Sequence, residues 1–94
     1  MFCVYILFSG KLNRYYTGST DDIERRIIQH NSASFEDAFT KKGIPWKIVL
    51  VIEGLESAQA FNIEKHIKKM KSAKYIQNLI HYPDMRIKLI ERFR

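Results

Sequence analysis

Residues Arg14–Asn31 read RYYTGSTDDIERRIIQHN and carry the signals of a strand, a turn and a helix in succession. Aromatic and β-branched residues favour a strand up to Gly18, which ends that pattern. Threonine and aspartate at positions 20–22 supply oxygens that can cap the first amides of a helix. Isoleucines four residues apart then predict an amphipathic helix that ends near His30 or Asn31.

Four side chains that could take part in catalysis or binding lie in this stretch and in the strand expected before it. They are Tyr5, Tyr16, Arg26 and His30. Strand alternation puts Tyr16 on the face opposite Tyr15, so the Tyr5 and Tyr16 hydroxyls converge if both point to the same side of a hairpin. Arg26 and His30 are one helical turn apart and flank the apolar stripe. We therefore expect Arg26 at the edge of the core and not on the open outer face.

Beyond this stretch, apolar periodicity predicts two more strands and three more helices, over Phe2–Phe8, Trp46–Glu53, Ala58–Met70, Ala73–His81 and Met85–Phe93. Gly54 is expected to end the third strand, and Ser57 and Asp84 to cap helices. The helix over Ala73–His81 is expected to start at Ser72 or nearby. Residues 32–45 are expected to form a polar connection. The order β-β-α-β-α-α, with an added C-terminal helix, predicts an α/β fold with a three-stranded sheet flanked by helices.

An acidic residue lies at the margin of one predicted helix stripe. Glu64 lies beside the apolar positions that we expect to face inward, Ala60, Ile63, Ile67 and Met70. A carboxylate in such a place needs a cation, a metal ion or a hydrogen-bond donor to offset its desolvation. An ion pair with Lys68, one turn further on, is the structural alternative to a metal-binding role.

Length, cysteine content and hydropathy bound the class of protein. Ninety-four residues make one domain, and the single cysteine, Cys3, excludes an internal disulfide and a cysteine-rich zinc site. The apolar run at residues 2–8 is too short for a signal peptide and has no basic segment before it. No run reaches the length of a membrane span. We expect a cytoplasmic protein without membrane contact.

Positive charge gathers in the second half of the chain. The net charge is +6, and residues 65–74 hold five lysines and a histidine with no acid. Such a block suits the backbone of a nucleic acid, although a solvated helix face has the same composition. The residues expected to contact nucleic acid are Arg14, Arg25, Lys65, Lys68, Lys69, Lys71 and Lys74.

Two triplets and their spacing resemble the GIY-YIG nuclease domain, in particular its small stand-alone bacterial type. The first triplet is Cys3-Val4-Tyr5, and the second is Tyr16-Thr17-Gly18, which opens into a helix with Arg26 ten residues beyond Tyr16. The run EKHIKKMKSAKYI from Glu64 adds to the likeness. The resemblance covers residues 1–80. Residues 81–94 are expected to be a helical extension of the same single domain.

The resemblance implies hydrolysis of phosphodiester bonds in DNA with one divalent ion, Mg²⁺ or Mn²⁺. Tyr16 or Tyr5 would take the proton of the attacking water, assisted by His30. Arg26 would hold the scissile phosphate and Glu64 would bind the metal, and Asn78 matches a supporting position only weakly. Guanidinium suits phosphate because it is always charged and binds in a bidentate manner. DNA repair or recombination with little sequence selectivity is the expected role, and RNA is not excluded.

One departure from the family pattern concerns the residue after Gly18. Ser19 stands where some repair endonucleases of the superfamily carry lysine. If that lysine lowers the pKa of the tyrosine, His30 or Arg14 must do so here, or activity is weak.

Two other readings stay open from the sequence. The first is a catalytically silent nucleic-acid-binding module with the same fold. The second makes the last helix a docking or dimerisation element through Leu89, Ile90 and Phe93, in a protein that is otherwise a monomer or a weak homodimer.

Overall fold

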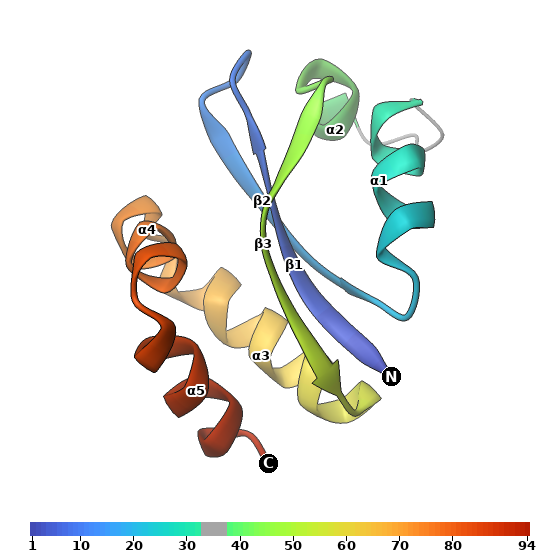
Figure 1. Ribbon diagram of the computed structural model, residues 1–94. Helices are drawn as coiled ribbons and strands as arrows, with labels where there is room; N and C mark the ends of the chain where they lie inside the picture. The colour runs from blue at the N-terminus through green and yellow to red at the C-terminus, as the bar shows by residue number, and fades with distance from the viewer. Residues whose placement is uncertain (33–37) are drawn as a thin grey trace.

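A three-stranded antiparallel sheet with strand order β2-β1-β3 forms the centre of the molecule (Figure 1). In this computed structural model the described residues are 1–32 and 38–94. The strands are β1 (Phe2–Ser9), β2 (Arg14–Thr20) and β3 (Trp46–Leu55). Five helices lie within the described residues: α1 (Ile23–Asn31), α2 (Ala38–Lys42), α3 (Ser57–Met70), α4 (Ala73–His81) and α5 (Pro83–Arg92). The predicted α/β class, with helices flanking three strands, is confirmed.

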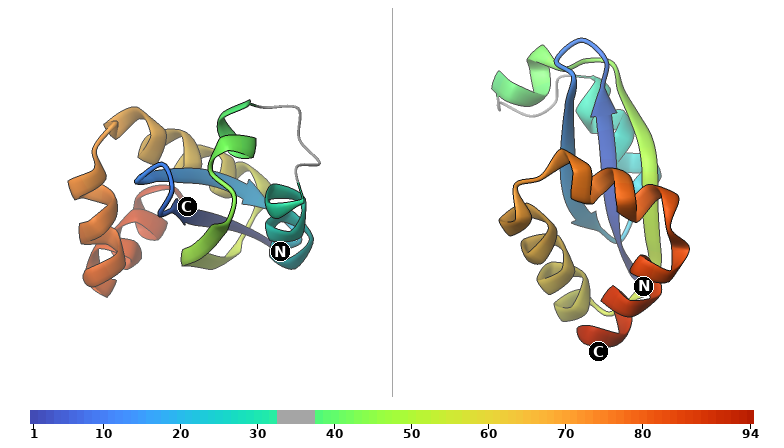
Figure 2. Two further views of the ribbon diagram at one scale, coloured as in Figure 1. Left: turned by 90° about the horizontal axis from the view of Figure 1, so that it is seen from above. Right: turned by 90° about the vertical axis from the view of Figure 1, so that its left-hand side faces the viewer.

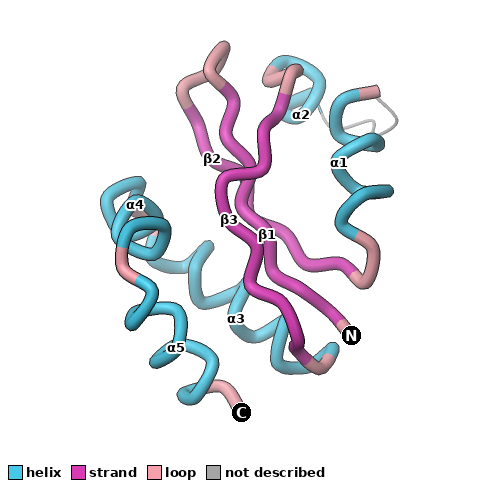
Figure 3. The backbone as a smooth tube through the Cα atoms, viewed as in Figure 1, coloured by secondary structure: helices cyan, strands magenta, loops and turns pink. Residues whose placement is uncertain are grey.

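The sheet separates the helices into two groups. Figure 3 shows α1 and α2 on one side of the strands and α3, α4 and α5 on the other, and α4 crosses in front of the strands in the right-hand view of Figure 2. Helices therefore cover both faces of the sheet. Across the described residues, the helices are too short or too polar to cross a bilayer.

Both faces of the central strand β1 are buried, as its continuous apolar sequence predicts. Val4 and Ile6 belong to the larger core cluster, with the α3 side chains Ala60, Ile63 and Ile67. Alternate residues Tyr5 and Leu7 point the other way and pack with Trp46, and α1 covers them with Ile23 and Ile27. The period of two along β1 thus divides the core into an α3 side and an α1 side.

The predicted end of the third strand at Gly54 is wrong, because β3 continues through it to Leu55. Phe2 pairs with Leu55 and Val4 with Ile52, so β3 carries one extra residue at this point. Gly54 has a φ of 74°. Glycine adopts such a positive φ without strain and is therefore common at the extra residue of a β-bulge. The strand bends at the bulge and continues beyond it.

The predicted connection over residues 32–45 is also wrong in part, because it contains the short helix α2. Its sequence, AFTKK, has too few residues to show a helical period, so tertiary context decides its conformation. Two lysines in its last turn suit the negative end of the helix dipole. The part of the connection between residues 33 and 37, with Phe35, lies outside the described residues.

Three details of the helices on the α3 side differ from prediction. Glu56, and not Ser57, is the N-cap of α3, in a capping box with Gln59. Helix α5 starts at Pro83 and not at Met85, since proline fits the first turn of a helix. Met70, predicted to face inward, is 44 % exposed. The start of α4 is as predicted, with the Ser72 side chain accepting from the amide of Tyr75.

The last helix packs on the chain's own core. Leu89 is buried, and Ile90 and Phe93 pack against the same cluster. Nη1 of Arg86 donates to the carbonyls of Leu79 at 2.6 Å and Ile80 at 3.0 Å, which satisfies the end of α4. The side chains that suggested a docking surface are therefore used internally, and that reading loses its support.

Gly18 is where the α1 side of the sheet is most crowded. Tyr5 pairs with Gly18 across β1 and β2, and the Tyr5 ring covers the position that a side chain would take. A Cβ atom at Gly18 would lie 2.6 Å from Cζ of Tyr5. The Tyr5 side chain is only 2 % exposed, so the ring has no free space to move into.

We predict that Gly18→Ala destabilises the protein by about 1–3 kcal/mol, because overpacking displaces a rigid buried ring. Gly10→Ala is the matched control, since nothing lies within 4 Å of a Cβ atom there, and we expect a change of at most about 0.5 kcal/mol. Urea unfolding of the two variants measures both values. Equal stability of Gly18→Ala and wild type would show that Tyr5 does not need the space above Gly18.

Candidate active site

Tyr5 and His30 form a buried polar pair on the α1 side of the sheet. The Tyr5 hydroxyl lies 3.1 Å from Nε2 of His30, and the two residues are 2 % and 1 % exposed. Asp22 accepts from the amide of Arg25 and so fixes the start of α1, which sets the phase of the helix that carries His30. His30 was predicted to flank the apolar stripe, and it is instead fully inside it.

Tyr16 completes an aromatic group with this pair. Its ring centroid is 4.7 Å from that of His30, 6.5 Å from that of Tyr5 and 6.0 Å from that of Trp46. Tyr5 and Tyr16 therefore share one face of the hairpin, which was the condition for their hydroxyls to converge. Tyr16 is half-buried where Tyr5 is enclosed, so solvent and substrate reach Tyr16 more easily.

Trp46 and Asn31 support this group, and nothing in the sequence marked Asn31 for the task. The Asn31 side chain donates to the Trp46 carbonyl at 3.1 Å and accepts from the Trp46 amide at 2.6 Å. The indole NH of Trp46 donates to the Thr40 carbonyl at 2.8 Å. These bonds tie the end of α1 and the helix α2 to the first residue of β3.

Charged residues from both sides of the sheet act on the Tyr5 phenol. Burial raises its pKa well above the usual value near 10, and Tyr16 and Glu64 raise it further, while Arg26 opposes the shift. The half-buried Arg26 on α1 and Glu64 on α3 are therefore both within electrostatic reach of one hydroxyl. At neutral pH Tyr5 keeps its proton and serves as a hydrogen-bonding group.

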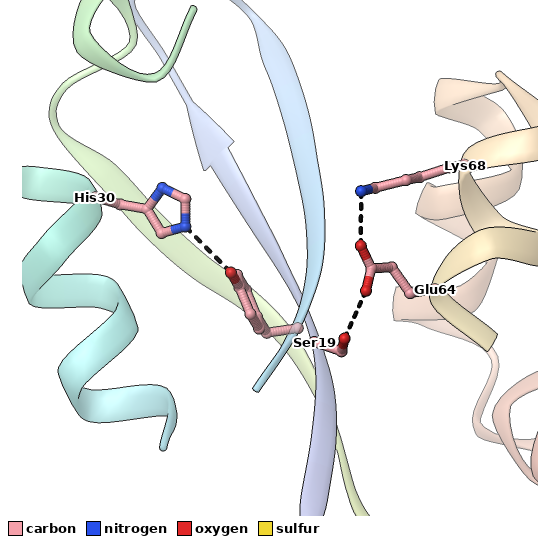
Figure 4. A network of polar contacts seen from close by, with 5 residues as sticks. Ser19, His30, Glu64 and Lys68 are labelled. Carbon is pink, nitrogen blue, oxygen red and sulfur yellow. Dashed lines mark hydrogen bonds and ion pairs between the residues drawn. The ribbon is translucent and has the colours of Figure 1, made fainter. Parts of the chain in front are cut away.

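Glu64 approaches from the opposite side of the sheet to His30 (Figure 4). One carboxylate oxygen accepts from the Ser19 hydroxyl at 2.5 Å, and the other pairs with Lys68 at 2.6 Å. The Glu64 side chain is 17 % exposed, which keeps it accessible at the margin of the core. The ion pair matches the structural alternative read from the sequence, whereas Ser19 was noted only as a departure from the family pattern.

The donor set at Glu64 fits a magnesium ion bound mainly by water. Among residues 1–32 and 38–94, no group of three or more His, Cys, Asp or Glu side chains could hold a metal ion. Magnesium often binds through one or two carboxylates and keeps several of its waters. Glu64 supplies such a carboxylate with the Ser19 hydroxyl beside it, provided that Lys68 leaves the oxygen with which it pairs.

Four of the seven predicted nucleic-acid contacts line two hollows on the surface, and Lys65, Lys69 and Lys74 line neither of them. All five lysines of residues 65–74 are exposed, as are Arg14 and Arg25. Arg14, Lys68 and Lys71 line one groove with Tyr16, and Arg25 lines a smaller pocket with Arg26. The weakly matched Asn78 is half-buried on α4, where its backbone carbonyl accepts from the amide of Tyr82.

We predict that Tyr5 makes the protein less stable as the pH rises above about 10. A free tyrosine ionises there, whereas folded Tyr5 keeps its proton, so unfolding releases a proton and becomes easier. The loss is about 1.4 kcal/mol per pH unit, and Tyr5→Phe should remove it. Urea unfolding between about pH 9 and 11 measures the slope, with Tyr82→Phe as an exposed control. The same slope in Tyr5→Phe as in wild type would contradict the assignment.

Comparison with known proteins agrees with the triplets read from the sequence. The family model of the GIY-YIG catalytic domain matches residues 1–77. A UPF0213 protein of Syntrophus aciditrophicus is 36 % identical over 82 residues, which cover 86 % of this chain and 92 % of that protein. None of the solved structures matches the chain significantly.

Two fungal relatives bear the name structure-specific endonuclease subunit slx1. The protein of Schizosaccharomyces japonicus is 39 % identical over 56 residues, and that of Aspergillus terreus 40 % over 63 residues. The matches cover 56 % and 63 % of this chain but only 20 % and 16 % of the fungal proteins. By the family match over most of its length and its likeness to a relative of similar size, the chain belongs to the GIY-YIG catalytic domain family.

Proposed function

We propose that this protein is a metal-dependent endonuclease that hydrolyses phosphodiester bonds in DNA with little sequence selectivity. The observation that carries the proposal is that the matched side chains converge on the Tyr5 hydroxyl. This hydroxyl is hydrogen-bonded to His30, the Tyr5 ring stacks with Tyr16, and the charges of Arg26 and Glu64 act on the phenol. The names of the two fungal relatives, structure-specific endonuclease subunits, support the endonuclease part of the proposal. A role in DNA repair or recombination is a further part of the proposal.

Tyr16 is better suited than Tyr5 to take the proton of the attacking water. The raised pKa of Tyr5 and its burial make it a poor base, whereas Tyr16 is half-buried and borders a groove. In the reaction, a water oxygen bonds to phosphorus and gives its proton to the Tyr16 side-chain oxygen, which passes the proton that it carried to solvent. The bond from phosphorus to the departing strand's oxygen breaks. Tyr5 and His30 hold the Tyr16 ring in place.

Arg26 and Glu64 would offset the negative charge of the phosphate, Arg26 directly and Glu64 through a bound divalent ion. The Arg26 guanidinium can bind two phosphate oxygens at once and offset their charge. Glu64 would hold a single Mg²⁺ or Mn²⁺ ion, which when bound neutralises charge on the reacting phosphate. The Ser19 hydroxyl orients the Glu64 carboxylate through a hydrogen bond.

We predict that Tyr16→Phe, Arg26→Ala and Glu64→Gln each slow nicking of supercoiled plasmid in Mg²⁺ by about 100-fold or more, because each removes a group that acts in the transition state. Gel analysis of plasmid relaxation gives the rates. Tyr82→Phe, Arg94→Ala and Glu53→Gln are matched controls of the same chemical types at exposed positions, and we expect near wild-type rates from them. An inactive wild-type protein, or variants that cut as fast as the controls, would refute the catalytic assignment.

A catalytically silent binding module is the second candidate, and one observation favours it. Both Glu64 carboxylate oxygens already have protein partners, in Ser19 and Lys68. Such a module would bind DNA with a steep salt dependence and without nicking. Its affinity would be unchanged by Glu64→Gln, which gel-shift titration at two salt concentrations can measure.

A further inference from the structure

The Glu64 carboxylate is held from two sides by groups of the chain itself (Figure 4). The Ser19 hydroxyl on β2 donates to Oε1, and the Lys68 ammonium on α3 lies 2.6 Å from Oε2. Ser19 is 45 residues from Glu64 in the sequence, whereas Lys68 is one helical turn away. The carboxylate that we assign to the metal is thus already neutralised by a neighbouring cation.

The two partners of Glu64 differ in their effect on a bound divalent ion. The Ser19 hydroxyl carries no net charge and bonds to one oxygen, so it can keep this bond while the carboxylate binds a metal ion. The Lys68 ammonium carries a full positive charge, and it would repel a divalent cation placed at the same carboxylate. Lys68 and a metal ion therefore compete for Oε2, whereas Ser19 and a metal ion do not.

Lys68 has a second place to go when it leaves Glu64. Half of its side chain is exposed, and its Nζ atom lies 5.9 Å from the centre of the Tyr16 ring. It also lines a groove of about 710 Å³ together with Arg14 and Lys71, and no described residue of that groove is acidic. A lysine stem rotates freely, so the ammonium can turn toward this groove without a change in the backbone of α3.

The strength of the ion pair suits a competitor that can be displaced. An exposed pair of this kind changes a binding constant by about fivefold at most, so a divalent ion in excess can break it. Magnesium bound by a single carboxylate keeps most of its waters and gains little from the protein. For such a weak site, the loss of even this factor sets the concentration of metal ion at which the site fills.

We propose that Lys68 is a built-in competitor of the divalent ion, which occupies Glu64 in the free protein and gives way when a metal ion binds. The inference rests on the proposed function and adds to it a control of the metal site. The alternative is that the pair only joins two turns of α3, as many pairs of this spacing do.

The test is the binding of Mn²⁺ to the full chain in about 0.15 M salt, measured by the electron paramagnetic resonance signal of free Mn²⁺. Lys68→Met removes the charge and keeps a stem of similar length. We expect this variant to bind Mn²⁺ about fivefold more tightly or better, because the ion pair and the repulsion both disappear. Lys65→Met is the matched control, since it removes the same charge from the exposed neighbour of Glu64, and its affinity should rise by less than about twofold.

A second control asks whether the gain passes through the carboxylate. Lys68→Met/Glu64→Gln should bind Mn²⁺ no more tightly than Glu64→Gln. Equal affinities of wild type and Lys68→Met, equal gains in Lys68→Met and Lys65→Met, or a gain that persists without the carboxylate would each overturn the proposal. Thermal melts of all variants verify that they are folded.

Binding is measured without DNA, so its result and the nicking result are independent. A wild-type protein that nicks plasmid while Lys68→Met shows no gain in Mn²⁺ affinity would refute the competitor and leave the nuclease function standing. A gain in affinity in a protein that does not nick would refute only the nuclease function.

Discussion

The packing of Tyr5 over Gly18 is the constraint on which the α1 side of the molecule depends. Because the ring fills the space above Gly18, its hydroxyl reaches Nε2 of His30 on α1. That bond fixes the end of α1 against the sheet, and the next residue, Asn31, then bonds to both backbone groups of Trp46. Because Gly18 has no side chain, the Tyr5 ring can lie over it and position α1, which in turn is hydrogen-bonded to Trp46, the first residue of β3.

The sheet divides the chemistry of the site between its two faces, and Lys68 is the residue that links the parts. It neutralises Glu64, lies near the Tyr16 ring and lines the groove. With 52 % of its side chain exposed, its ion pair is of the solvent-accessible kind, which contributes only about 0–1 kcal/mol. A metal ion at Glu64 or a phosphate in the groove can therefore draw Lys68 away at little cost.

The elements that could be predicted from the sequence are those with local causes. Ser72 caps α4, and Ile23 and Ile27 of α1 face the core, because a cap and a helical stripe involve residues only a few positions apart. Gly54 was misread because a positive φ can end a strand or form a bulge, and only pairing with β1 decides between them. The short helix α2 shows no period, so its formation depends on its neighbours.

The sequence by itself determined the order of the elements other than α2, the alternation of faces along β1, the inward face of α1 at Ile23 and Ile27, and the spacing of Tyr16, Gly18 and Arg26. The side-chain periods of 2 residues in a strand and 3.6 residues in a helix are properties of the backbone, so they can be recognised in the sequence before the fold is known. Only the tertiary structure decided that His30 is buried against Tyr5, that Ser19 holds Glu64 and that Asn31 holds Trp46. These partners are 25, 45 and 15 residues apart, and their contacts exist only because the helices pack on opposite faces of one sheet.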